Sequence, residues 1–102
     1  MDEKTVVMGG DFKLNVSFLP IGGFTMDDVD FAITLWNCNR RLKIGKEEMV
    51  RVDSQNYVAC VHSEQLGKGV LNLRMEADFP DSDFQEGVRK EVDVVMSVIK
   101  II

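Results

Sequence analysis

The sequence is poor in the residues that build metal centres, disulfide frameworks and catalytic clusters. Its 102 residues include two cysteines, two prolines, one histidine and one tryptophan. Cys38, Cys60 and His62 lack the paired ligand spacing of a zinc site, so we expect no metal and no cofactor. His62 and Ser63 have no third orienting group in the sequence, which predicts a surface histidine rather than a catalytic one. Function is therefore expected on faces and edges of the fold.

An excess of basic residues and long apolar runs are also missing. The formal net charge is −5, whereas a nucleic-acid-binding protein needs a basic face, so nucleic acid is not an expected partner. No apolar run reaches the roughly 20 residues that span a bilayer, and the opening "MDEKTVVMGG" does not resemble a signal peptide. We expect synthesis in a cytoplasm and no membrane partner. Cys38 and Cys60 are then expected as reduced, partly buried thiols, with pairing across adjacent strands as the alternative.

What the sequence does contain is apolar–polar alternation with the period of β-strands. It runs through residues 11–19, 27–36, 69–79 and 88–102. The expected inner positions are Phe12, Leu14, Val16 and Phe18; Val29, Phe31, Ile33 and Leu35; Leu71, Leu73, Met75 and Ala77; and Val92, Val94, Met96 and Val98. Residues 27–36 are also fairly apolar on their other face, which is typical of a central strand.

Shorter strands are expected between these runs, at residues 5–8, 42–44, 49–52 and 57–62. Turn residues separate them, and residues 45–49 suffice for one helical turn at most. The pattern predicts an all-β fold, an immunoglobulin-like antiparallel β-sandwich of about seven strands. Residues 1–102 are expected to form one domain.

The stretch "SEQLGKG", residues 63–69, contains two glycines that invite comparison with a phosphate-binding loop. Such a loop precedes a helix, whereas here a strand is expected to follow, so a structural corner is favoured. Ser63 is expected to cap a single helical turn and Leu66 to plug the core. Gly67 is expected in the left-handed conformation, and Gly69 at the start of the next strand.

An acidic segment, residues 78–86, holds Asp78, Asp81, Asp83 and Glu86 around a proline. A solvated turn is the favoured interpretation, because the spacing does not match a calcium-binding loop; a weak cation site is the alternative. Phe79 and Phe84 flank this loop. They are expected either to pin it to the sandwich or to be exposed contacts for a partner.

The final run, "VDVVMSVIKII", is β-branched and low in charge, so it would make an adhesive edge if uncovered. Val95 and Ile99 are expected on its outward face. We therefore predict a homo-oligomer or an edge that a partner covers.

Three segments carry a family resemblance: "MGGDFKLNVSF", "FTMDDVDFAITLW" and "HSEQLGKGVLNLRMEADFPD". In this order they resemble the N-terminal immunoglobulin-like domain of phage baseplate upper proteins and short prophage-encoded relatives in gut Bacteroidetes. The resemblance implies a non-enzymatic structural domain, made in a bacterial cytoplasm and assembled with other virion proteins. The chain ends at Ile102 without the stalk and receptor-binding parts of those proteins, which favours assembly or adaptor contacts.

A second hypothesis is a carbohydrate-binding or adhesin-type sandwich of a bacterial surface system. Exposed aromatic residues on one sheet face would favour it, because sugar rings stack on aromatic planes. Trp36 and Tyr57 are the aromatic residues outside the phenylalanines. An enzyme is not predicted, because no cluster of titratable residues stands out.

Overall fold

The computed structural model describes residues 4–17, 23–38 and 40–102, without the side chains of residues 4 and 94–98. The described residues form eight strands and two short 3₁₀ turns. The strands are β1 (Lys4–Val6), β2 (Asp11–Val16), β3 (Asp30–Trp36), β4 (Arg41–Gly45), β5 (Val50–Asp53), β6 (Asn56–His62), β7 (Gly69–Pro80) and β8 (Val88–Ile101). The turns are Lys46–Glu48 and Ser63–Gln65.

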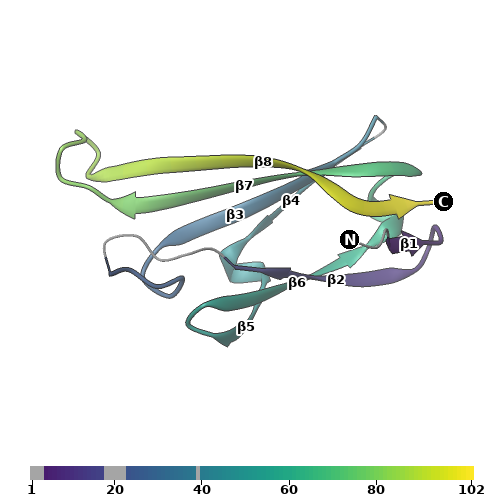
Figure 1. Cartoon of the computed structure of the whole chain (residues 1–102), viewed down its shortest axis with the longest axis horizontal. Helices are drawn as coiled ribbons and strands as arrows, with labels where there is room; N and C mark the ends of the chain where they lie inside the picture. The colour runs from purple at the N-terminus through teal and green to yellow at the C-terminus, as the bar shows by residue number, and fades with distance from the viewer. Residues whose placement is uncertain (1–3, 18–22, 39) are drawn as a thin grey trace.

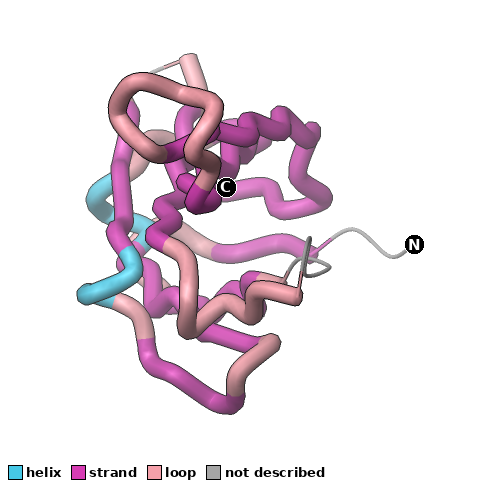
Figure 2. The backbone as a smooth tube through the Cα atoms, turned by 90° about the vertical axis from the view of Figure 1, so that its left-hand side faces the viewer, coloured by secondary structure: helices cyan, strands magenta, loops and turns pink. Residues whose placement is uncertain are grey.

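Two sheets pack face to face (Figure 1). One has the strand order β1-β8-β7-β3-β4 and the other the order β2-β6-β5, and Figure 2 shows the layers along the long axis. The β2-β6-β5 and β3-β7-β8 groups correspond to the core of the immunoglobulin topology. The expected all-β sandwich is thus confirmed, with one departure from a purely antiparallel fold, since β1 pairs with β8 in parallel.

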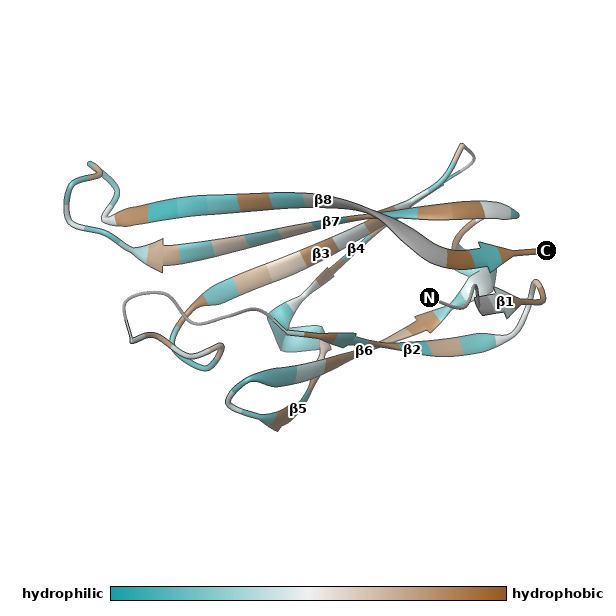
Figure 3. Cartoon of the chain, viewed as in Figure 1, coloured by the Kyte–Doolittle hydropathy of each residue, from teal (hydrophilic) through white to brown (hydrophobic). Residues whose placement is uncertain are grey.

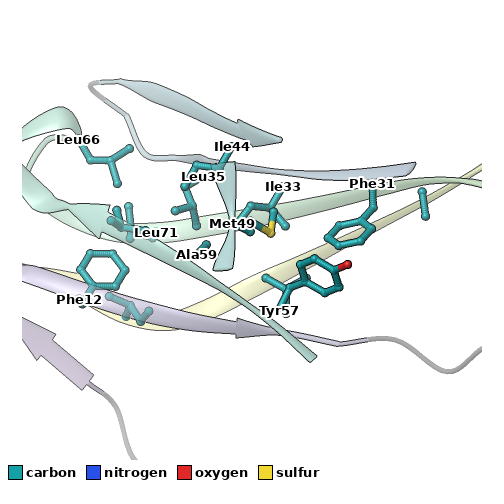
Figure 4. Packing of buried hydrophobic residues seen from close by; sticks show 14 of the residues in the cluster. Phe12, Phe31, Ile33, Leu35, Ile44, Met49, Tyr57, Ala59, Leu66 and Leu71 are labelled. Carbon is teal, nitrogen blue, oxygen red and sulfur yellow. The ribbon is translucent and has the colours of Figure 1, made fainter. Parts of the chain in front are cut away.

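The core forms where the inner faces of the two sheets meet (Figure 4). Phe31, Ile33 and Leu35 of β3 are all buried, as their alternation predicts. β3 lies between β7 and β4 in the sheet, so the expected central strand is confirmed. On its outer face Thr34 is buried and Trp36 is half-buried, because side chains of the neighbouring strands stand beside them.

The expected facing of β8 is wrong. Val92, expected inside, is 46% exposed, and Ile99, expected outside, is only 4% exposed. Ile99 belongs to the buried core cluster, and its backbone pairs with Lys4 of β1. In this strand the residues on both faces are apolar, so alternation in the sequence does not show which face points into the core. Val95 pairs through its backbone with Leu73, and its side chain lies outside the described residues.

The corner at residues 63–69 is confirmed in outline and corrected in two details. Leu66 is buried as the plug and Gly69 begins β7. Ser63 does not cap the helical turn; its Oγ accepts a hydrogen bond from the backbone N–H of Gly9 at 2.8 Å. The left-handed glycine is Gly69, with φ of 132°, and not Gly67. The chain therefore turns at the start of β7, after the 3₁₀ turn has ended.

Candidate interaction site

The most densely bonded polar cluster begins at Lys46, which follows directly after β4. Its ammonium group lies 5.5 Å from the ring centroid of Phe31. The same group donates three hydrogen bonds to backbone carbonyls, those of Met26 (2.9 Å), Asp27 (3.1 Å) and Val29 (2.8 Å). An ammonium group has three N–H donors, so these carbonyls use all of them. Lys46 thereby holds the loop that leads into β3.

Arg51 of β5 and Tyr57 of β6 hold the same loop from the other sheet, through the loop residue Asp27. Its carboxylate accepts two hydrogen bonds from Arg51 at 2.8 Å each, and one from the hydroxyl of Tyr57 at 2.6 Å. The bonds from Arg51 and Tyr57 hold the pKa of Asp27 well below its ordinary value, while the bond to Asp27 and burial raise the pKa of Tyr57. We call Lys46, Asp27, Arg51 and Tyr57 the latch. Its polar atoms bind one another or the backbone, which makes it a structural element.

The loop at residues 81–87 connects the long strands β7 and β8 at one end of the molecule (Figure 1). Its backbone is cross-linked by hydrogen bonds from Asp81 to Gly87 and from Gly87 to Phe84, both 2.9 Å. The carboxylate of Asp81 accepts a third, from the backbone N–H of Asp83 at 3.0 Å. Gly87 adopts φ of 77°, a conformation that favours glycine. The loop is therefore ordered by its own bonds.

Apolar side chains follow the outer side of this hairpin. Phe84 is 47% exposed at the loop, and Val88 and Val92 are similarly exposed along β8. Figure 3 shows the first half of β8 as largely hydrophilic, with hydrophobic segments between the hydrophilic ones. Phe79 is buried and pins the base of the loop. Phe79 therefore pins the loop, as one alternative expected, and Phe84 is exposed; a contact of Phe84 with a partner stays a prediction. We call Phe84, Val88 and Val92 the hairpin patch.

A second surface lies on the outer face of the five-stranded sheet. Two adjoining hollows of about 200 and 360 Å³ share Lys43 and Glu76 as lining residues. The floor is made by Ala32 and Thr34 of β3, which are small, and the walls by longer charged side chains of β4 and β7. Trp36 closes one end. This face was not predicted, because its residues come from four strands and a 3₁₀ turn, and the sequence does not give the register of those strands.

On that face, the carboxylate of Glu76 is partly buried and interacts with two basic side chains. Burial opposes its ionisation, but the hydrogen bond from Lys90 at 3.3 Å and the charge of Arg74 outweigh burial, so the pKa of Glu76 is lowered. Glu76 is therefore an anion at neutral pH. Lys90 lies opposite Asp78 in the sheet, so it serves the acidic end of the face.

The remaining sequence candidates lie apart from these surfaces. Cys38 and Cys60 are free and exposed, which corrects the expectation of partial burial. His62 is exposed, as expected, and its Nδ1 lies 2.8 Å from a carboxylate oxygen of Asp11. Within the described residues no group of three or more His, Cys, Asp or Glu side chains could hold a metal ion. No helix in that part of the chain is long and apolar enough to cross a membrane.

Comparison with known proteins returned no match: no protein-family model, curated protein or solved structure is similar to this chain.

Proposed function

We propose that this chain is a non-enzymatic assembly domain of a phage or prophage tail baseplate, and that it works through protein–protein contacts. The observation that carries the protein-contact part is the hairpin patch, in which an exposed aromatic side chain stands on an ordered loop. The baseplate setting comes from the sequence resemblance alone. The partners are other virion proteins, with self-association as an additional mode.

The hairpin patch has two properties of a protein-binding site. Its loop is already cross-linked, so little conformational entropy is lost when a partner orders it. Phe84 supplies a large exposed apolar side chain, and Val88 and Val92 of β8 are exposed as well; aromatic residues are enriched among interface contacts. The loop also carries Asp83 and Glu86, both exposed. A partner that fits this surface has an apolar pocket with basic residues at its rim.

The direct test uses the proteins encoded next to this chain's own gene. Each is co-expressed with the chain, and binding is measured by co-elution and by titration calorimetry. The hypothesis predicts that a neighbouring tail protein binds and that Phe84→Ser weakens binding by about tenfold or more. Val52→Ser is the control, because Val52 is an exposed apolar residue on β5 and not part of the hairpin. Equal loss with both variants would argue against the hairpin patch.

The baseplate setting has a separate test. Particles are purified from an induced culture of the host and probed with an antibody against the chain. The chain should band with tail structures at a fixed ratio to other tail proteins. Its absence from every particle fraction, in a cell that does express it, would remove the baseplate proposal while leaving protein binding open to the first test.

The second candidate function is carbohydrate binding, and one observation favours it. Trp36 lines the 360 Å³ hollow together with Thr34 and the cationic Arg41 and Arg74. An indole beside cations suits a sugar that carries a carboxylate. The test of carbohydrate binding is a titration with acidic polysaccharides in which the fluorescence emission of this single tryptophan is monitored. Saturable binding that titration calorimetry also detects and that Trp36→Phe weakens in calorimetry, with Phe84→Ser unaffected, would favour this candidate over the hairpin patch.

A further inference from the structure

The outer face of the five-stranded sheet differs in charge from the rest of the chain. Around its two hollows stand four acidic and four basic side chains, which cancel, although the whole chain carries −5. The acidic ones are Asp30, Glu47, Glu76 and Asp78, and the basic ones are Arg41, Lys43, Arg74 and Lys90. We call this surface the dipolar face, because its charges are separated along the strands.

The strand register shows the separation. At one end Asp30 lies opposite Asp78, which places like charges side by side. Two rows further along β3, Thr34 lies between Lys43 and Arg74, and the next row ends with Trp36 opposite Arg41. A strand rises about 3.3 Å per residue, so the acidic and basic ends are about 20 Å apart.

The basic end has cations available to a partner. Among the described residues, Arg41 and Lys43 take part in no ion pair, and Arg74 reaches Glu76 only at 3.5 Å. The centre between the two ends is low, because Ala32 and Thr34 are small. A second flat surface can therefore approach the centre while charged side chains meet at both ends.

We propose that the dipolar face binds the same face of a second copy of this chain, with the strands of the two copies reversed. A two-fold axis in the plane of the interface, across the strands, turns one copy end for end and places its basic end over the acidic end of the other. Such an isologous contact is self-complementary, because each charge is used twice. Glu76 of one copy then lies near Arg74 of the other, and Glu47 near Arg41. Val92 lies opposite Glu76 in the sheet, so it borders the dipolar face, whereas Phe84 stands on the loop beyond the strands. The contact therefore does not depend on Phe84 or on its binding to another protein.

The contact is expected to be weak and sensitive to salt. Exposed charge pairs are screened over about 10 Å at 0.1 M salt and over about 3 Å at 1 M. The dissociation constant for self-association should therefore rise about tenfold or more between 50 mM and 500 mM sodium chloride. An interface made by apolar side chains alone would be insensitive to salt or strengthened by it.

Charge exchange between two variants gives the decisive experiment. Arg41→Glu with Arg74→Glu makes the face mostly acidic, and Glu47→Lys with Glu76→Lys makes it mostly basic. Each variant alone should be monomeric by sedimentation velocity, under conditions where the native chain is a dimer. An equal mixture of the two should form a heterodimer. Lys13→Glu, on the other sheet, is the control and should leave the native dimer intact.

Three outcomes would overturn the proposal: a native chain that stays monomeric at millimolar concentration, a dimer that neither variant disturbs, or folded variants that fail to associate when mixed. Circular dichroism and thermal unfolding first establish that each variant is folded, and only folded variants are then tested for association. The Phe84→Ser chain should dimerise as the native chain does, so failure here is distinguishable from failure of the hairpin patch. A monomer whose Trp36 emission responds to an acidic polysaccharide would assign the face to a carbohydrate instead.

Discussion

Replacing Lys46 with methionine tests whether the latch stabilises the fold. Methionine keeps most of the apolar stem but removes the ammonium group that donates to the carbonyls of Met26, Asp27 and Val29. The bond to Asp27 is exposed, so water can replace it, whereas the other two are partly buried. A partly buried carbonyl that loses its donor costs about 1 kcal/mol. Loss of the cation above the ring of Phe31 adds about 0.5 kcal/mol.

The expected loss in the free energy of unfolding is therefore about 2–3 kcal/mol, which lowers the melting temperature by roughly 10–15 °C for a domain of this size. Urea unfolding followed by tryptophan emission measures it. Lys13→Met is the matched control, because Lys13 is an exposed lysine of β2, and it should change stability by less than about 0.5 kcal/mol. If Lys46→Met falls within that same range, water replaces the ammonium group and the latch is not a stabilising element.

Three further predictions concern single contacts. The pKa of Asp27 is lowered from 3.8, so its stabilising effect is complete above that pH and is lost as the pH falls further; the stability difference between the native chain and Asp27→Asn should be constant above pH 5 and shrink below pH 3.8 in acid titrations. The pKa of His62 is raised from 6.5 by its bond to Asp11, so this pair stabilises fully below pH 6.5 and loses its effect as the pH rises through the folded pKa; Asp11→Asn should return the pKa of His62 toward 6.5 in an NMR titration. Ser63→Ala leaves the Gly9 N–H without its buried acceptor and should cost about 1–2 kcal/mol in urea unfolding; no change would mean that the corner relaxes.

The fold was more predictable than the surfaces, for a physical reason. In β3 one face is strongly apolar, so alternation identified Phe31, Ile33 and Leu35 as core residues. In β8 both faces are apolar, so alternation predicted the wrong inward face: Ile99 was expected to point outward and is buried. The pairing of β8 with β7 and with β1 decides which face is buried, and alternation along β8 does not reveal either register.

The surfaces depend even more on register. Arg41, Arg74 and Trp36 are far apart in sequence and line one hollow only because β4 and β7 pair with β3 at particular positions. A shift of one residue in either strand would turn its charged side chains to the other face. In the hairpin patch only Phe84 was easy to foresee, because it lies in an acidic turn segment that a single stretch of sequence displays, whereas Val92 was expected inside and is exposed. Local features were thus predictable, and features assembled across strands were not.

The 3₁₀ turn Lys46–Glu48 contributes Lys46 to the latch and Glu47 to the dipolar face. Substitutions of these two neighbours can therefore separate an effect on stability from an effect on dimerisation. Lys46 bonds to the loop before β3, while the carboxylate of the next residue, Glu47, lies over Gly45, where an added Cβ would come within 2.6 Å of it. Lys46→Met should therefore lower stability without changing the salt dependence of dimerisation at temperatures where the chain is folded. Glu47→Lys should weaken dimerisation with little effect on stability, since Glu47 is exposed. If both variants changed both properties together, the turn would act as one unit, and the separation of a structural latch from a binding face would be wrong.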